Sequence, residues 1–181
     1  LVLLLLGIIS GTLLAFVNYF TAPLIAAAEE KLQWDALKEF YYDVNDPNYD
    51  TYDLKNMFDL SKNDYPNSDV SSIFVLKDKT TGDIDALGYL VSADGYSSSS
   101  PITMLIVVNN DLTVRGYKVV NHTESPGYGA DIVENDFNIQ TITDLSGFDA
   151  VAGVTFTSDG ILRCFELVSE RVANDFGGGI Q

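Results

Sequence analysis

Residues 1–20 contain no charged side chain, and this run constrains the fold of the chain more than any other feature. The run is rich in Leu, Val and Ile, and Gly7 and Gly11 are spaced so that another helix can pack closely against them. A helix that crosses a bilayer needs roughly 20 mostly apolar residues. We therefore expect a transmembrane helix over residues 1–22, with residues 1–20 in contact with the lipid bilayer.

Helical periodicity continues after Pro23, where apolar residues recur at helical spacing up to Phe40 and charged residues fill the opposite face. This pattern predicts a juxtamembrane stalk helix over residues 23–42. A cleaved signal peptide is the alternative, because residues 26–28 are three alanines that can mimic a cleavage site. The length of the apolar run and its passage into further helical sequence favour an anchor.

The composition of the chain excludes several kinds of partner. Its formal net charge is −16, so its surface repels nucleic acid and anionic membrane surfaces, and we expect no nucleic-acid partner. The same charge disfavours loose binding of a phosphate-bearing cofactor and favours a covalent link or a strictly local site. Cys164 is the single cysteine, which excludes an intrachain disulfide and a multi-cysteine metal cluster. We expect Cys164 to be a small packing residue.

Four apolar segments separated by turn residues predict β-strands. The strands are expected at residues 73–76, 86–91, 102–108 and 112–120. Their hairpin-length connections indicate antiparallel pairing, and helical segments precede and follow them in the sequence. The predicted fold class is therefore α+β, with an antiparallel sheet flanked by helices.

The limits of this domain follow from composition. Residues 43–69 are rich in Asp, Asn and Tyr, which predicts a solvated loop region with short turns. We expect the domain to occupy residues 43–176 and a flexible glycine-rich tail to occupy residues 177–181.

One hydroxyl group lies in a small-residue turn just before an amphipathic helix. Thr155 follows Gly153 and Val154, and apolar residues recur at helical spacing from Ile161 to Val172. An anion near a helix start meets free backbone N–H groups and the positive end of the helix dipole. The pattern therefore allows a phosphate at Thr155. The alternative is that Thr157 or Ser158 only caps the helix and Thr155 has no role.

A second motif follows the last predicted strand. His122 and Glu124 alternate with Thr123, and residues 125–129 form a turn around Pro126 and Gly127. Turn N–H groups with a nearby His and Glu can bond a planar heterocycle. The alternative is a strand end with a surface histidine.

Together the two motifs resemble the FMN-binding domain family. The first resembles that family's flavin-attachment motif at Asp149, Gly153 and Thr155 and at Thr157 and Ser158, and differs from it at Ala152 and Val154. The second resembles a signature turn of the family. Its matches are His122, Glu124, Pro126, Gly127 and Gly129, and its substitutions are Ser125 and Tyr128.

The resemblance implies a covalent FMN, esterified through its phosphate to Thr155 by a flavin transferase. It implies that Gly153 makes room for the phosphate and that His122, Glu124 and the turn of Ser125, Pro126, Gly127, Tyr128 and Gly129 contact or shield the flavin. The remaining cofactor-binding positions implied are Ala152, Val154, Thr157 and Ser158. No catalytic residue and no metal site is expected.

Within the family, the membrane exit at residues 21–25 resembles that of the G subunits of Rnf complexes, the ion-translocating ferredoxin:NAD oxidoreductases. The C subunits of sodium-translocating NADH:quinone reductases are close relatives, and the short interval between Gly129 and Asp149 favours the G subunits. The resemblance implies an electron relay that works with the other membrane and electron-transfer subunits of such a complex. It also implies a bacterial or archaeal cell membrane, with the domain on the extracytoplasmic side. A stand-alone membrane-anchored flavoprotein and a non-redox, membrane-tethered binding module remain the alternatives.

Overall fold

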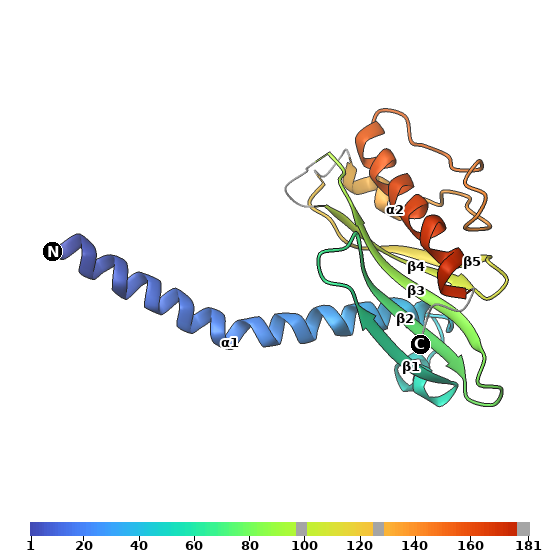
Figure 1. The fold of residues 1–181 in the computed structure, drawn as a ribbon, viewed down its shortest axis with the longest axis horizontal. Helices are drawn as coiled ribbons and strands as arrows, with labels where there is room; N and C mark the ends of the chain where they lie inside the picture. Colours follow the sequence, from blue (N-terminus) through green and yellow to red (C-terminus); the bar gives the residue numbers. More distant parts are fainter. Residues whose placement is uncertain (97–100, 125–128, 177–181) are drawn as a thin grey trace. The chain divides into compact units, whose positions relative to one another are not determined.

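The computed structural model describes residues 1–96, 101–124 and 129–176 (Figure 1). The chain divides into two compact units, Leu1–Asp35 and Ala36–Gln181. The second unit contains two short 3₁₀ helices, Tyr49–Thr51 and Leu54–Asn56, and a third at Gly129–Glu134. It also contains a five-stranded sheet and the helix α2 (Thr155–Asn174).

Helix α1 (Val2–Glu39) is continuous and includes Pro23. Its apolar window is long and apolar enough to cross a membrane, and the side chains of that window are not buried by other parts of the protein. The predicted anchor and the start of the predicted stalk thus form one helix. Its last residues, from Ala36 onward, belong to the second unit, where Ala36 and Leu37 are buried.

The sheet is an antiparallel meander in the order β1-β2-β3-β4-β5. The strands are β1 (Phe58–Asp64), β2 (Val70–Asp78), β3 (Ile84–Ala93), β4 (Ile102–Asn109) and β5 (Val114–Asn121). Strands β2, β3 and β4 contain the first three predicted segments, and the predicted α+β class is confirmed. The fourth prediction, residues 112–120, begins two residues too early, because Leu112 has a φ of +68° and β5 starts at Val114.

Strand β1 lies in the segment for which the sequence predicts only loops and turns, so that prediction is wrong for Phe58–Asp64. Its side chains are mostly polar, and only Phe58 is buried. A full ladder of backbone pairs with β2, from Phe58↔Asp78 to Asp64↔Ser72, holds it in the sheet. Polar and charged side chains are common on edge strands, where they oppose pairing of the free edge with another chain.

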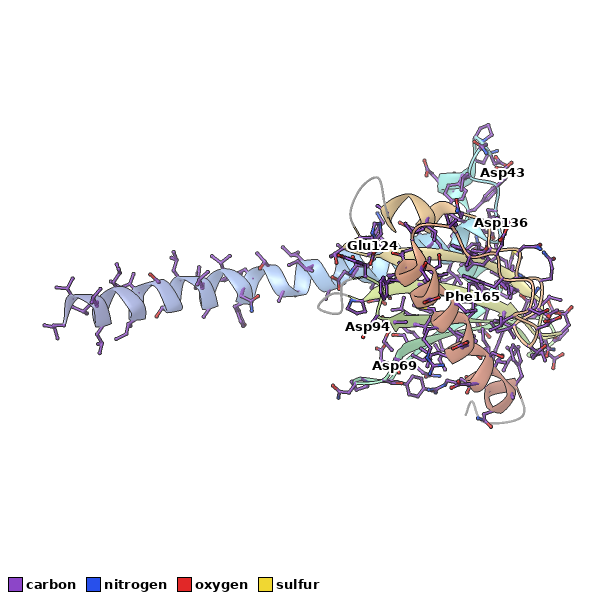
Figure 2. All side chains as sticks on the ribbon, turned by 90° about the horizontal axis from the view of Figure 1, so that it is seen from above. Asp43, Asp69, Asp94, Glu124, Asp136 and Phe165 are labelled. Carbon is purple, nitrogen blue, oxygen red and sulfur yellow. The ribbon has the colours of Figure 1, made fainter. Side chains whose placement is uncertain are left out.

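Different segments cover the two faces of the sheet. One face packs against α2, where the buried Phe165 belongs to the same hydrophobic core as Tyr89 of β3 (Figures 1 and 2). On the other face, a Cβ placed on Gly88 of β3 would lie 3.2 Å from Leu37, near the end of α1, and 3.5 Å from Leu105. Burial on both faces explains why β2, β3 and β4 are nearly continuous apolar runs.

The burial of Cys164 confirms that it is a packing residue, as predicted. It is fully buried on the sheet side of α2, and burial raises the pKa of its thiol to about 12. The thiolate is the reactive form of cysteine, so this group is chemically inert in the folded protein.

The packing of Phe40 against Gly116 of β5 tests whether the chain around the end of α1 covers the sheet face opposite α2. A Cβ on Gly116 would overlap the Phe40 ring, so we expect Gly116→Ala to destabilise the protein by roughly 1–3 kcal/mol through overpacking. The penalty should shrink when Gly116→Ala is made in a Phe40→Ala background. Thermal unfolding of the detergent-solubilised chain measures both. Gly7→Ala, where a Cβ meets nothing within 4 Å, is the control. Equal penalties in the two backgrounds would contradict the contact.

Candidate functional site

The chain enters α2 through a tight reversal of the backbone, which lies between two residues that pack against the hydrophobic core. Val151 and Val154 both pack against the hydrophobic core, and the Val154 N–H donates to the Val151 carbonyl at 3.4 Å. Between them, Ala152 and Gly153 are exposed, and Gly153 has a φ of +90°. L side chains rarely adopt this conformation, so glycine is the residue that permits the reversal.

Thr155 is the first residue of α2, and it is exposed. Val154 occupies the N-cap position, where its apolar side chain makes no capping hydrogen bond. None of the hydrogen bonds found among the described residues uses the Thr155 hydroxyl or the backbone N–H groups of residues 155–157. An anion bonded to this hydroxyl would meet unbonded donors and the positive end of the dipole of a 20-residue helix.

The alternative prediction, that Thr157 or Ser158 caps α2, is wrong. Both residues lie inside the helix, and they are only 2% and 0% exposed. The Ser158 hydroxyl accepts a hydrogen bond from the Val151 N–H at 3.3 Å and donates one to the Val154 carbonyl at 3.1 Å. Ser158 therefore holds the reversal against the helix, and its side chain is closed to a ligand.

Glu124 follows β5, and its buried carboxylate joins three distant segments of the chain. One oxygen accepts a hydrogen bond from the Thr157 hydroxyl at 2.8 Å, and the other accepts one from the Tyr96 N–H at 3.2 Å. The side chain is 7% exposed, and no salt bridge in the described part of the chain involves it. We call this arrangement the Glu124 junction; Figure 2 labels Glu124.

Glycines allow the backbones around the Glu124 junction to approach closely. A Cβ on Gly95 would lie 2.6 Å from a Glu124 oxygen, and a Cβ on Gly129 would lie 2.5 Å from both Glu124 and Thr157. A Cβ on Gly160 would lie 2.6 Å from the Asp94 carbonyl. The start of α2, the end of β3 and the chain on both sides of residues 125–128 are therefore packed together without room for side chains.

The second predicted motif is only partly described. His122 is half-buried, and its Nδ1 accepts a hydrogen bond from the Glu124 N–H at 3.3 Å. The predicted contacts of Ser125, Pro126, Gly127 and Tyr128 lie outside the described residues. The structure thus brings Glu124 and Gly129 of this motif together with Thr157 of the first, and it directs the Glu124 carboxylate inward.

The site predicted from the sequence lacks two exposed aromatic residues: Phe156, which follows Thr155 in the chain, and Tyr96, whose ring contacts that of Phe156. Tyr96 is 75% exposed and Phe156 is 68% exposed, and their rings contact edge to face with centroids 6.2 Å apart. One signal in the sequence indicates Phe156: it is out of phase with the apolar stripe of Ile161, Phe165 and Val168. No local sequence pattern predicts that Tyr96 lies beside Phe156, because their contact depends on the Glu124 junction.

The residues present fit a phosphate-linked flavin at Thr155. The acceptor hydroxyl is exposed, and a Cβ on Gly153 would meet no atom of the described residues within 4 Å, so these residues leave the space beside it open. Of the two departures from the family motif, Val154 directs its bulk into the core, and Ala152 is exposed. Neither side chain obstructs the hydroxyl.

Comparison with known proteins confirms the predicted resemblance. Residues 95–168 match the model of the FMN-binding domain family, and this stretch contains Tyr96, the Glu124 junction and Thr155. The chain is 25% identical to the G subunit of the proton-translocating ferredoxin:NAD(+) oxidoreductase complex of Clostridium ljungdahlii, over 94% of this chain and 88% of the relative. It is 26% identical to the G subunit of the ion-translocating oxidoreductase complex of Methanosarcina acetivorans, over 51% of this chain and 55% of the relative. These relatives support an electron-transfer flavoprotein subunit of an oxidoreductase complex.

The backbone at Gly153 generates a prediction. Gly153→Ala should destabilise the protein by about 1–2 kcal/mol, because the cost of a positive φ remains although the added methyl group meets open space. The neighbouring exposed substitution Ala152→Ser should be neutral within about 0.5 kcal/mol. Thermal unfolding of the detergent-solubilised chain measures both. A loss for Gly153→Ala no larger than that for Ala152→Ser would show that the positive φ is not required.

Proposed function

We propose that this chain is an electron-relay subunit of a membrane-bound, ion-translocating ferredoxin:NAD oxidoreductase complex, and that its FMN is joined by a phosphoester to Thr155. The observation that supports the proposal most strongly is the exposed Thr155 hydroxyl at the first position of α2, beside unbonded helix N–H groups. The match of residues 95–168 to the FMN-binding domain supports the cofactor, and the two relatives support the type of complex.

The proposed attachment joins the Thr155 side-chain oxygen to the phosphorus of the FMN half of FAD. The pyrophosphate bond of FAD breaks, AMP leaves, and the hydroxyl proton is released to a base of the flavin transferase. The exposure of Thr155 leaves the hydroxyl accessible to such an enzyme, whereas Thr157 and Ser158 are too buried to serve as acceptors.

The residues of the site then have separate roles. Bound FMN supplies the redox chemistry, and the protein holds and orients it. The first N–H groups of α2 are placed to bond the phosphate, and Gly153 leaves the space beside it open. Ser158 and the Glu124 junction fix the helix start on which Thr155 lies. Thr155 itself is a tether and transfers no electrons.

The apolar part of α1 is proposed to anchor the chain in the membrane as a single span over residues 1–22. The rest of α1, which ends at Glu39 and not at the predicted residue 42, is proposed to lead to the domain, whose compact unit already includes Ala36 and Leu37. The length and composition of α1 support this assignment. The domain is proposed to lie on the extracytoplasmic side, and the other membrane and electron-transfer subunits of the complex are the expected partners. The predicted flexible tail, residues 177–181, lies outside the residues that the structure describes.

Covalent attachment is tested by co-expressing the full chain with a flavin transferase and denaturing it on a gel. We expect a fluorescent band and a Thr155 peptide carrying the added mass of FMN. Thr155→Ala should abolish both, and Thr155→Ser should retain them because it keeps the hydroxyl. Val44→Ala, which alters an exposed apolar residue outside the site, is the matched control. A band that survives Thr155→Ala would show that another residue is the acceptor.

Membership of a complex is tested by purifying the tagged full-length chain from its native membrane. We expect the other subunits of an ion-translocating oxidoreductase to co-purify in a mild detergent, and the Thr155→Ala chain to retain them because it lacks only the tether. A flavinylated chain that never associates with such subunits would instead indicate a stand-alone flavoprotein.

A further inference from the structure

Two exposed aromatic side chains meet beside the start of α2, although few large apolar side chains are exposed in the unit Ala36–Gln181. Among the described residues of Ala36–Gln181, the large apolar side chains that remain exposed are Val44, Met57, Tyr96 and Phe156. The two aromatic ones are in contact with each other, and Phe156 is bonded directly to Thr155. We refer to Tyr96 and Phe156 as the aromatic pair.

Hydrogen bonds to the buried Glu124 hold the backbone at both members of the aromatic pair. The Tyr96 backbone N–H donates to Glu124, and the same carboxylate accepts the hydroxyl of Thr157, the residue after Phe156. The Glu124 junction therefore fixes the separation of the two backbones, while both rings extend to the surface. Their planes meet at 67°, so the pair forms a corner with the face of one ring beside the edge of the other.

The size of this patch argues for a small planar occupant. A standard protein interface takes about 800 Å² from each partner, far more than two side chains can supply. Aromatic rings instead favour offset-stacked or edge-to-face contact with another flat ring system. The tethering residue Thr155 adjoins the pair, so a heteroaromatic group attached there is held at high local concentration.

We propose that the aromatic pair is the contact surface for the isoalloxazine ring of the flavin, which makes Tyr96 and Phe156 cofactor-contact residues. This inference rests on the proposed attachment of FMN to Thr155. Tyr96 is the more informative member, because it is distant from Thr155 in sequence and touches the flavin only if the ring lies over the pair. Glu124 acts through Tyr96 and Thr157, so it is a positioning residue.

The experiment compares full-length chains in detergent after co-expression with the flavin transferase, each with its flavin content determined by mass. A tyrosine ring in contact with a flavin quenches its fluorescence, and a fixed asymmetric environment gives the flavin visible circular dichroism. Tyr96→Ala should therefore raise the fluorescence yield per bound flavin several-fold and diminish the visible circular dichroism. Phe156→Leu should diminish the circular dichroism, whereas Tyr96→Phe should retain it because the ring remains.

Val44→Ala is the control, because it changes an exposed apolar residue outside the aromatic pair and should alter neither signal. Alanine at position 96 keeps the backbone N–H that bonds Glu124, and unchanged far-ultraviolet circular dichroism verifies the fold. The inference is overturned if Tyr96→Ala carries flavin but leaves its fluorescence yield and visible circular dichroism unchanged. Absence of flavin on Thr155 of the unaltered chain would instead overturn the proposed function.

Discussion

The site depends on the burial of one carboxylate. Glu124 is almost completely removed from water, and burial of such a group is costly unless hydrogen bonds replace its hydration. The Thr157 hydroxyl and the Tyr96 N–H supply these bonds, and they come from segments far apart in the sequence. Removal of either donor would leave a carboxylate oxygen without its bond, so the start of α2 and the end of β3 are strongly held together.

The sheet provides the frame for this junction. Strands β2 to β4 are buried on both faces, so α2 packs on a rigid apolar surface through Phe165 and Cys164. The glycines at positions 95, 129 and 160 then let the backbones at its amino-terminal end approach within the reach of one side chain. Close packing in the core thereby leaves the first turn of α2 ordered, with Thr155 and Phe156 still at the surface.

The sequence predicts those parts of the structure that local patterns determine. Apolar runs locate β2 to β5, and the motif around Gly153 and Thr155 locates the candidate acceptor. Strand β1 escapes prediction because a backbone ladder, not its side chains, holds it in the sheet. The prediction of a cap at Thr157 or Ser158 fails because their hydroxyls have other partners, and that of Thr157 lies 33 positions away in the chain. The contact between Thr157 and Glu124 leaves no local signal in the sequence.

A covalent tether of the proposed kind would change what the rest of the site must do. The chain has a net charge of −16, which opposes non-covalent retention of an anionic cofactor. A bond at Thr155 removes that requirement, since retention no longer depends on the free energy of binding. The remaining contacts then need only orient the ring, and a few exposed groups suffice for this. With the proposed tether, the loss of a hydroxyl at Ala152 would also be tolerable, because the helix N–H groups remain available to donate hydrogen bonds to the phosphate.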